Sequence, residues 1–358
     1  MNRATSIYLD LARFIAAMVV FVGHLSGARF TGGLFWQAGP FMAEAVAIFF
    51  VLSGFVIGFA VDRREHSARD YAINRAARIY SVALPALAIT FALDALGRAV
   101  DPTLYAPWWG YVADGRLGQC LAGLFFVNQL WFAQIPQGSD LPYWSLGYEV
   151  WYYVIFGMAV FARWRIAGAA LACLIAGPKI LAMLPLWLLG LGCYRLCARI
   201  TLSAVAGLCL WLAALGLWLF YEIWAMRHHR LLGLVPAALG RPELLQDYLV
   251  GVLFATALLG FRFASPLIGA PLLALAPPIR WAAGATFSIY LLHLPIAQFL
   301  ATQMPWPPQA WATRAILMPG TLALIFVIAE MTERRKEIWR RGIAYLLPRV
   351  APLRSEDA

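Results

Sequence analysis

Charged side chains are scarce in this sequence of 358 residues, of which they make up 13%. A soluble globular domain carries about a quarter. Hydrophobic residues account for 62% of the chain, and its mean hydropathy is +0.72, too high for a surface that faces water. The composition therefore excludes an ordinary soluble protein and favours one long domain embedded in a membrane.

Acidic residues are the rarer of the two charge types. The chain has 18 aspartates and glutamates against 28 lysines and arginines, which gives a net charge of +10. In a soluble protein such an excess would point to nucleic acid. Here the basic residues gather in short segments between apolar runs, as they do in the cytoplasmic loops of membrane proteins. We therefore expect the lipid bilayer as a partner and no nucleic acid.

Cysteine is also sparse, with five residues that all lie in or beside apolar segments. Cys193 and Cys197 are four residues apart, but no histidine or second cysteine pair completes a zinc-binding pattern. We interpret the cysteines as small packing residues and expect no metal site.

Apolar runs of roughly membrane-spanning length are abundant. They cover residues 6–28, 41–61, 79–97, 145–162, 165–179, 181–198, 202–222, 246–262, 281–303 and 311–331. This pattern predicts an all-α, polytopic transmembrane helical bundle of about ten spanning helices. We expect residues 1–344 to form one membrane-embedded domain and residues 345–358 a short cytoplasmic tail.

An eleventh apolar segment covers residues 118–134. The arginine-rich loop 62–78 and the basic C-terminal region should both be cytoplasmic, which requires an even number of crossings. Most other short basic loops are cytoplasmic only if 118–134 does not cross. We therefore predict a re-entrant or interfacial segment buried against protein, in which Asn128 and Gln129 line a cavity. The long basic loop 223–245 falls outside in this topology and is a candidate for contact with an anionic acceptor.

Ionisable side chains inside spanning segments are costly and therefore mark candidate functional sites. The first helix carries Asp10, Arg13 and His24, which share one face at about 100° per residue. Asp10 can pair with Arg13, which offsets the cost of burying either charge. The alternative for His24 is a structural histidine that is hydrogen-bonded to a neighbour.

Arg75 and Arg78 lie one helical turn apart beside the membrane surface. Two guanidinium groups at that spacing suit a ligand that carries phosphates. Contact with lipid headgroups is the alternative interpretation.

Two further segments combine polar and aromatic residues. Glu149 is the lone acid of the aromatic run from Tyr143 to Tyr153, with Ser145 on nearly the same face, and it is a candidate to orient His24 or to shuttle its proton. Tyr290 and His293 share a face of the segment 281–303, for which a hydrogen-bonded packing seam is the alternative. Ser53 and Gly54, in the second span, are interpreted as packing residues.

These segments together resemble the acyltransferase 3 family of membrane acyltransferases. The resemblance covers roughly residues 6–335 and rests on five motifs in the family's order. They are Asp-x-x-Arg with Arg-x10-His at Asp10, Arg13 and His24, Phe-Phe-Val-Leu-Ser-Gly-Phe at 49–55, Arg-x-x-Arg at Arg75 and Arg78, Trp-Ser-Leu-x-x-Glu from Trp144 to Glu149, and Tyr-Leu-x-His from Tyr290 to His293. A later Glu-x-Pro signature is only partly echoed, by Glu330 and Glu333.

The resemblance implies a bacterial inner-membrane enzyme that takes an acyl group, usually acetyl, from cytoplasmic acyl-CoA. The acceptor would be a hydroxyl of an extracytoplasmic glycan or glycolipid, and acyl-CoA would be a substrate rather than a bound cofactor. By this match His24 is the central catalytic residue, supported by Arg13 and Glu149, while Arg75 and Arg78 hold the donor's phosphates. Substrate contacts are expected from Asp10, Trp144, Ser145, Tyr290 and His293.

A different class of protein remains as an alternative, because histidine, glutamate and arginine within a membrane also form proton relays. A small-molecule permease or proton-coupled exporter would use them in this way. An inverted repeat would favour that reading, and the sequence shows none.

Overall fold

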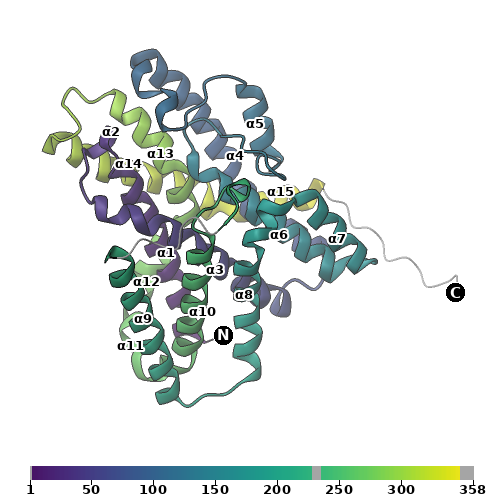
Figure 1. Ribbon diagram of the computed structural model, residues 1–358. Coiled ribbons are helices and arrows are strands. Elements are labelled where there is room, and N and C mark those ends of the chain that lie inside the picture. Colours follow the sequence, from purple (N-terminus) through teal and green to yellow (C-terminus); the bar gives the residue numbers. More distant parts are fainter. Residues whose placement is uncertain (1, 228–234, 347–358) are drawn as a thin grey trace, which may run out of the picture.

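The computed structural model describes residues 2–227 and 235–346, and within these residues it is helical without a β-strand (Figure 1). The main helices are α1 (Arg3–Leu25), α2 (Ala28–Thr31), α3 (Met42–Arg63), α4 (Ala68–Val100), α5 (Arg116–Leu124), α6 (Trp144–Phe161), α7 (Arg165–Ala176), α8 (Pro178–Arg199), α9 (Ala204–Arg227), α10 (Leu244–Ile268), α11 (Ala270–Ala274), α12 (Ala276–Ala283), α13 (Thr286–Thr302), α14 (Trp311–Met331) and α15 (Lys336–Leu346). Short 3-10 turns are η1 (Trp36–Phe41), η2 (Pro102–Leu104), η3 (Pro107–Trp109), η4 (Leu141–Tyr143), η5 (Ala237–Leu239) and η6 (Glu333–Arg335). The predicted all-α class is confirmed.

Every apolar run predicted to span contains a helix, but fewer meet the requirements of a full span. Among the described residues, seven helices are long and apolar enough to cross a membrane, or eight if the bent pair α12–α13 is one span. Helix α7, with 12 residues, is too short, and α6 is diluted by Glu149 and by its tyrosines. The predicted count of about ten is therefore approximate. The chain is a multi-pass membrane protein.

The segment 118–134 does not form a spanning helix. Helix α5 ends at Leu124, and the chain then continues without helix to η4. Asn128 is fully buried and donates to Gln137 at 3.1 Å, whereas Gln129 lines a cavity. Irregular backbone is tolerated at membrane depth only where it is buried in protein or lines a water-filled cavity. This segment meets that condition, because it contains the buried Asn128 and the cavity-lining Gln129.

The predicted span 281–303 is bent rather than straight. Helices α12 and α13 meet at an angle of 51°. The break exposes the first backbone N–H groups of α13, which need an acceptor. Glu333 supplies it: the carboxylate accepts from the backbone N–H of Phe287 at 3.2 Å and of Ser288 at 2.9 Å. A negative charge at a helix N-terminus also complements the helix dipole.

Helix α3 runs through the middle of the bundle and contacts α1, α8 and α10. Its approach to α8 depends on two glycines. A Cβ atom on Gly54 would collide with the backbone carbonyl of Trp187, and one on Gly190 would collide with that of Val51. The packing role predicted for Gly54 is therefore confirmed, because only glycine allows the two backbones to lie this close.

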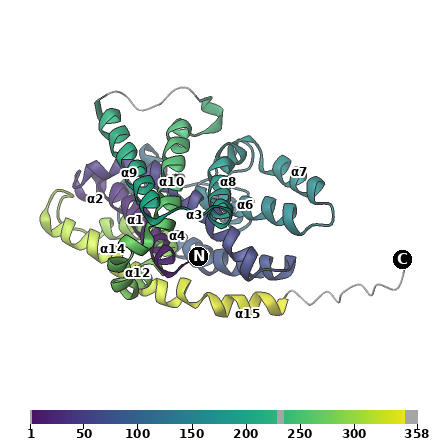
Figure 2. The same cartoon turned by 90° about the horizontal axis from the view of Figure 1, so that it is seen from below.

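The described ends of the chain lie on one face of the bundle. Asn2 and Arg3 line the same cavity as Lys336 and Arg340, and α15 runs along that edge in Figure 2. Arg69, near the start of α4, donates to the carbonyl of Ala344 at 2.9 Å. This arrangement fits the even number of crossings that the sequence predicts. The predicted tail 345–358 lies almost entirely outside the described residues, as do residues 228–234 of the loop 223–245.

The close contact between α3 and α8 makes a prediction about stability. We expect Gly54→Ala to lower the free energy of unfolding by about 1–3 kcal/mol, since the added methyl group must push two helix backbones apart. Thermal unfolding of the detergent-solubilised protein measures the effect.

Gly192→Ala is the matched control, because this glycine of α8 is exposed and its Cβ would meet nothing within 4 Å. Alanine should leave stability unchanged or raise it by up to about 1 kcal/mol. Equal melting temperatures for the two variants would contradict the proposed backbone contact.

Candidate active site

His24 and His293 form a hydrogen-bonded pair between α1 and α13. Nδ1 of His24 lies 2.9 Å from Nε2 of His293, and Nδ1 of His293 lies 2.8 Å from the carbonyl oxygen of Ile289. A carbonyl only accepts, so His293 carries its proton on Nδ1, and in the neutral ring its Nε2 is an acceptor. Nδ1 of His24 must then donate. The lone pair of His24 therefore lies on Nε2. The His24 side chain is partly exposed.

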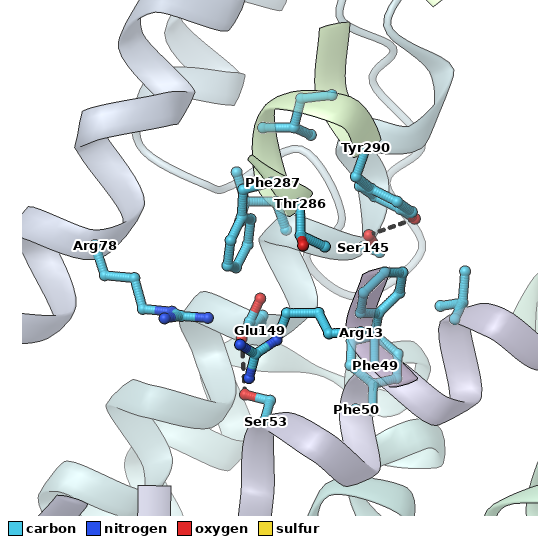
Figure 3. A pocket seen from close by; sticks show the side chains of 13 residues that line it. Arg13, Phe49, Phe50, Ser53, Arg78, Ser145, Glu149, Thr286, Phe287 and Tyr290 are labelled. Carbon is cyan, nitrogen blue, oxygen red and sulfur yellow. Dashed lines mark hydrogen bonds between the residues drawn. The ribbon is translucent and has the colours of Figure 1, made fainter. Parts of the chain in front are cut away.

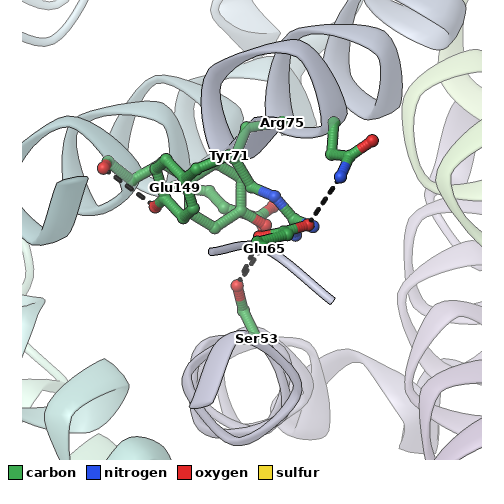
Figure 4. A network of polar contacts seen from close by, with 7 residues as sticks. Ser53, Glu65, Tyr71, Arg75 and Glu149 are labelled. Atoms are coloured by element: carbon green, nitrogen blue, oxygen red, sulfur yellow. Dashed lines mark hydrogen bonds and ion pairs between the residues drawn. The ribbon is translucent and has the colours of Figure 1, made fainter. Parts of the chain in front are cut away.

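Glu149 is held by other partners than His24. Its Oε1 accepts from Ser53 Oγ at 2.7 Å (Figure 4) and from the hydroxyl of Tyr153. Trp187 donates to the same serine at 3.2 Å. The orienting contact that we expected from Glu149 is made instead by His293. Ser53 was interpreted as a packing residue, and the structure adds a hydrogen bond to the candidate catalytic carboxylate.

A small buried pocket of about 40 Å³ brings several predicted residues together. The guanidinium groups of Arg13 and Arg78 reach it from opposite sides, and Glu149 lies between them (Figure 3). Ser145 Oγ donates to the hydroxyl of Tyr290 at 2.9 Å, which links α6 to α13 across the same pocket. His293 lies one turn beyond Tyr290 on α13, so the histidine pair stands past the far end of this pocket.

A larger cavity of about 840 Å³ opens beside the chain ends. Eight basic residues line it, together with three acidic ones. The basic residues are Arg3, Arg13, Arg64, Arg75, Arg78, Arg280, Lys336 and Arg340, and the acidic residues are Asp10, Glu65 and Glu337. We call it the cationic cavity. Because Arg13 and Arg78 line both spaces, the cationic cavity and the buried pocket adjoin each other.

The two arginines of the Arg-x-x-Arg motif differ in their partners. Arg75 forms an ion pair with Glu65 and lies over the ring of Tyr153, 5.6 Å from its centroid (Figure 4). Arg78 contacts the ring of Phe287 at 4.8 Å, and no carboxylate of the described residues lies within ion-pair distance of it. Arg78 therefore offers the less compensated charge to an anionic ligand.

The other predicted site residues lie in different parts of the bundle. Asp10 pairs with Arg13 at 3.8 Å, as predicted, and lies in the cationic cavity, about 21 Å along α1 from His24. Trp144 lies in a different cavity, near Tyr148, with ring centroids 5.1 Å apart. The shared helical face of Asp10, Arg13 and His24 therefore serves two separate regions rather than one.

Some polar residues of the interior were missed by the sequence analysis. Lys179 is 2% exposed and lines the same cavity as Trp144. Its only sequence signal is that it is a lone base between two apolar runs. Among residues 2–227 and 235–346, no cluster of three or more histidine, cysteine, aspartate or glutamate side chains is placed to hold a metal ion.

Comparison with known proteins gives consistent matches. The family model of the acyltransferase 3 family, described as an acyltransferase domain, matches residues 6–330. Acyltransferase MdmB of Streptomyces mycarofaciens is 27% identical over 188 residues, which are 48% of this chain and 46% of that protein. Exopolysaccharide production protein ExoZ of Rhizobium meliloti (strain 1021) is 31% identical over 145 residues, 38% of this chain and 41% of that protein.

The matched region thus spans less than half the length of either curated relative. No solved structure matches the chain. The family model, by contrast, covers the first helix, the buried pocket and the histidine pair within one continuous match. The chain belongs to the acyltransferase 3 family, whose model is described as an acyltransferase domain.

Proposed function

We propose that this enzyme moves an acyl group, in the first instance acetyl, from cytoplasmic acyl-CoA to a hydroxyl of an extracytoplasmic carbohydrate or glycolipid in the bacterial inner membrane. The observation that carries the proposal is that Arg13 and Arg78 line both the cationic cavity and the buried pocket. The charge of the cationic cavity suits a polyanionic ligand head, and a thin tail attached to that head would point toward the buried pocket. One relative is named an exopolysaccharide production protein, which supports a carbohydrate acceptor.

The donor would bind from the face on which the chain ends lie. Basic residues concentrate on the cytoplasmic side of membrane proteins, which supports a cytoplasmic cationic cavity and cytoplasmic N- and C-termini. Arg75 and Arg78 would bind the phosphates of CoA, since guanidinium groups form strong hydrogen bonds with phosphate oxygens. The pantetheine arm would pass Arg13 into the buried pocket and carry the thioester toward the histidine pair.

His24 would act through Nε2. In direct transfer, this nitrogen removes the proton of the acceptor hydroxyl while the hydroxyl oxygen attacks the thioester carbonyl. The carbon–sulfur bond then breaks, and the CoA thiolate takes the proton from the imidazolium. In a relay, Nε2 attacks the carbonyl itself, the carbon–sulfur bond breaks and CoA leaves as the thiolate. The hydroxyl then attacks the acyl-imidazolium, releases its proton to solvent and expels neutral His24 as the ester forms. Parallel lines in double-reciprocal plots would support the relay, and intersecting lines would support direct transfer.

The permease alternative loses its basis with the family assignment. The residues that suggested a proton relay lie within the region that the family model matches. Arg13 pairs with Asp10 and lines the cationic cavity, whereas His24 is hydrogen-bonded to His293 and Glu149 to Ser53. We therefore assign the ionisable residues of α1, α4 and α6 to binding and catalysis.

His24→Ala tests the catalytic role directly. We expect hydrolysis or transfer of acetyl-CoA by the purified, detergent-solubilised protein to fall by about 10²–10⁴-fold, the usual loss for a general acid–base residue. CoA binding should persist, because His24 lies outside the cationic cavity.

His66→Ala is the control, since His66 is exposed and lines none of these spaces. Equal turnover in wild type and His24→Ala, or no CoA binding by either, would remove His24 from the mechanism.

Arg78→Gln tests the donor site. We expect the Kd for CoA to rise by about ten-fold or more, because a charge-assisted hydrogen bond contributes about 1.5–3 kcal/mol. The affinity of the wild type should also fall with salt, as for any bound polyanion. Arg165→Gln removes an exposed arginine outside the cavity and should leave the Kd unchanged. An unchanged Kd in Arg78→Gln would place the phosphates elsewhere.

His293 is a positioning residue in this mechanism, and two variants separate that role from simple packing. His293→Phe keeps a ring but removes the acceptor for His24 Nδ1, so kcat should fall by about 10²–10⁴-fold with little change in KM for acetyl-CoA. His293→Gln offers a carbonyl acceptor at a similar distance and should recover part of the loss. If both variants behave alike, His293 does not set the tautomer of His24.

A further inference from the structure

A separate cavity of about 390 Å³ lies at the opposite end of α3 from the cationic cavity. Arg241, which lines it, donates to the carbonyl of Ala43 in the first turn of α3, at 3.1 Å. Arg64, directly after the last turn of the same helix, lines the cationic cavity. Because α3 has 22 residues, about 33 Å separate its two ends. We call this second cavity the distal cavity. If the cationic cavity faces the donor, the distal cavity, at the other end of α3, faces the acceptor.

Lys179 brings an uncompensated positive charge to the distal cavity. Its side chain is 2% exposed, and Nζ donates to Gln129 Oε1 at 2.9 Å and to the carbonyl of Ala133 at 2.7 Å. Both acceptors are neutral. Within residues 2–227 and 235–346, no carboxylate lies within ion-pair distance of this ammonium group. An ammonium group has three hydrogens, so one remains available to a ligand.

The other cation of the distal cavity is compensated. Arg241 Nε and Nη2 donate to the two carboxylate oxygens of Asp247 at 2.7 and 3.1 Å, and its guanidinium group lies 5.4 Å from the ring centroid of Trp144. The net charge that an incoming group meets therefore comes from Lys179. Burying an ammonium group without a counter-charge is unfavourable, and an anionic ligand would offset that penalty.

The remaining lining suits a sugar. Trp144 is half-buried and meets Tyr148 edge to face, which leaves aromatic surface for the apolar face of a pyranose ring. Gln129 and Gln134 add amide donors and acceptors for hydroxyl groups. Apolar surface with a few placed polar groups is the usual composition of a small-molecule site.

We propose that the distal cavity binds the acceptor and selects a carbohydrate that carries an anionic group, a carboxylate or a phosphate, which pairs with Lys179. The inference rests on the proposed function, because it identifies the cavity as the acceptor side of the same transferase. The helix α6 connects the two regions: Trp144 lies in the distal cavity, while Ser145 and Glu149 line the buried pocket.

The test measures binding rather than turnover. Purified protein in detergent is titrated with an oligoglucuronate, with the neutral oligoglucose of the same length, and with glucose 1-phosphate, and the quenching of tryptophan fluorescence is followed. We expect at least one anionic sugar to bind about ten-fold more tightly than the neutral one. Which of the two does so identifies carboxylate or phosphate as the recognised group.

Variants assign the preference to Lys179. Lys179→Met should abolish the difference between anionic and neutral sugars, while Lys179→Arg should retain most of it because the charge remains. Lys336→Met, a cation of the cationic cavity, should leave it unchanged. A thermal unfolding curve for each variant shows that it is folded. Equal affinity for all three sugars, or an undiminished preference in folded Lys179→Met, would overturn the inference.

The same samples separate this inference from the proposed function. Binding of CoA and the dependence of acetyl-CoA turnover on His24 are measured in parallel. Failure of these two would overturn the transferase mechanism whatever the sugars do. If both hold and the sugars do not discriminate, only the assignment of the distal cavity to an anionic acceptor is wrong.

Discussion

The hydrogen bond between His24 and His293 is the contact on which the candidate reaction centre depends. It joins the first helix to α13, 269 residues later in the chain, and it determines which nitrogen of His24 holds the lone pair. The position of His293 depends in turn on the break before α13. That break is possible because Glu333 accepts from the backbone N–H groups that the bend leaves without intrahelical partners. A carboxylate in the turn after α14 thereby helps to orient an imidazole that it does not touch.

Charge is distributed along the bundle according to whether it has a partner within the chain. In an apolar interior an isolated charge is far more costly than in water, and some buried charges are offset by ion pairs, as Arg75 is by Glu65 and Arg241 is by Asp247. Arg78 and Lys179 have no such ion pair among the described residues, and they lie toward opposite ends of the molecule. Both line cavities. Uncompensated charge therefore lies where the proposed mechanism requires an anionic donor and an anionic acceptor.

The two cavities lie at opposite ends of α3. This helix carries no ionisable group between Glu44 and Asp62, and its glycine contact with α8 leaves no space between those two helices. The polar residues between the two ends lie instead near α1, α6 and α13, where Arg13, Glu149 and the histidine pair are found. In the proposed mechanism the acyl group would cross on this side of the bundle.

The sequence by itself determined the class of protein, the membrane-embedded helices and the residue types of the site, because apolar runs and buried ionisable groups are local properties of the chain. It also placed Arg75 and Arg78 on one helical turn and paired Asp10 with Arg13, since both relationships depend only on helical spacing. Tertiary structure decided which side chains meet. His24 bonds to His293 rather than to Glu149, Glu149 bonds to Ser53, and Lys179 bonds to neutral Gln129 rather than to a carboxylate. These contacts join residues from 50 to 269 positions apart, and no helical periodicity extends across the loops between them.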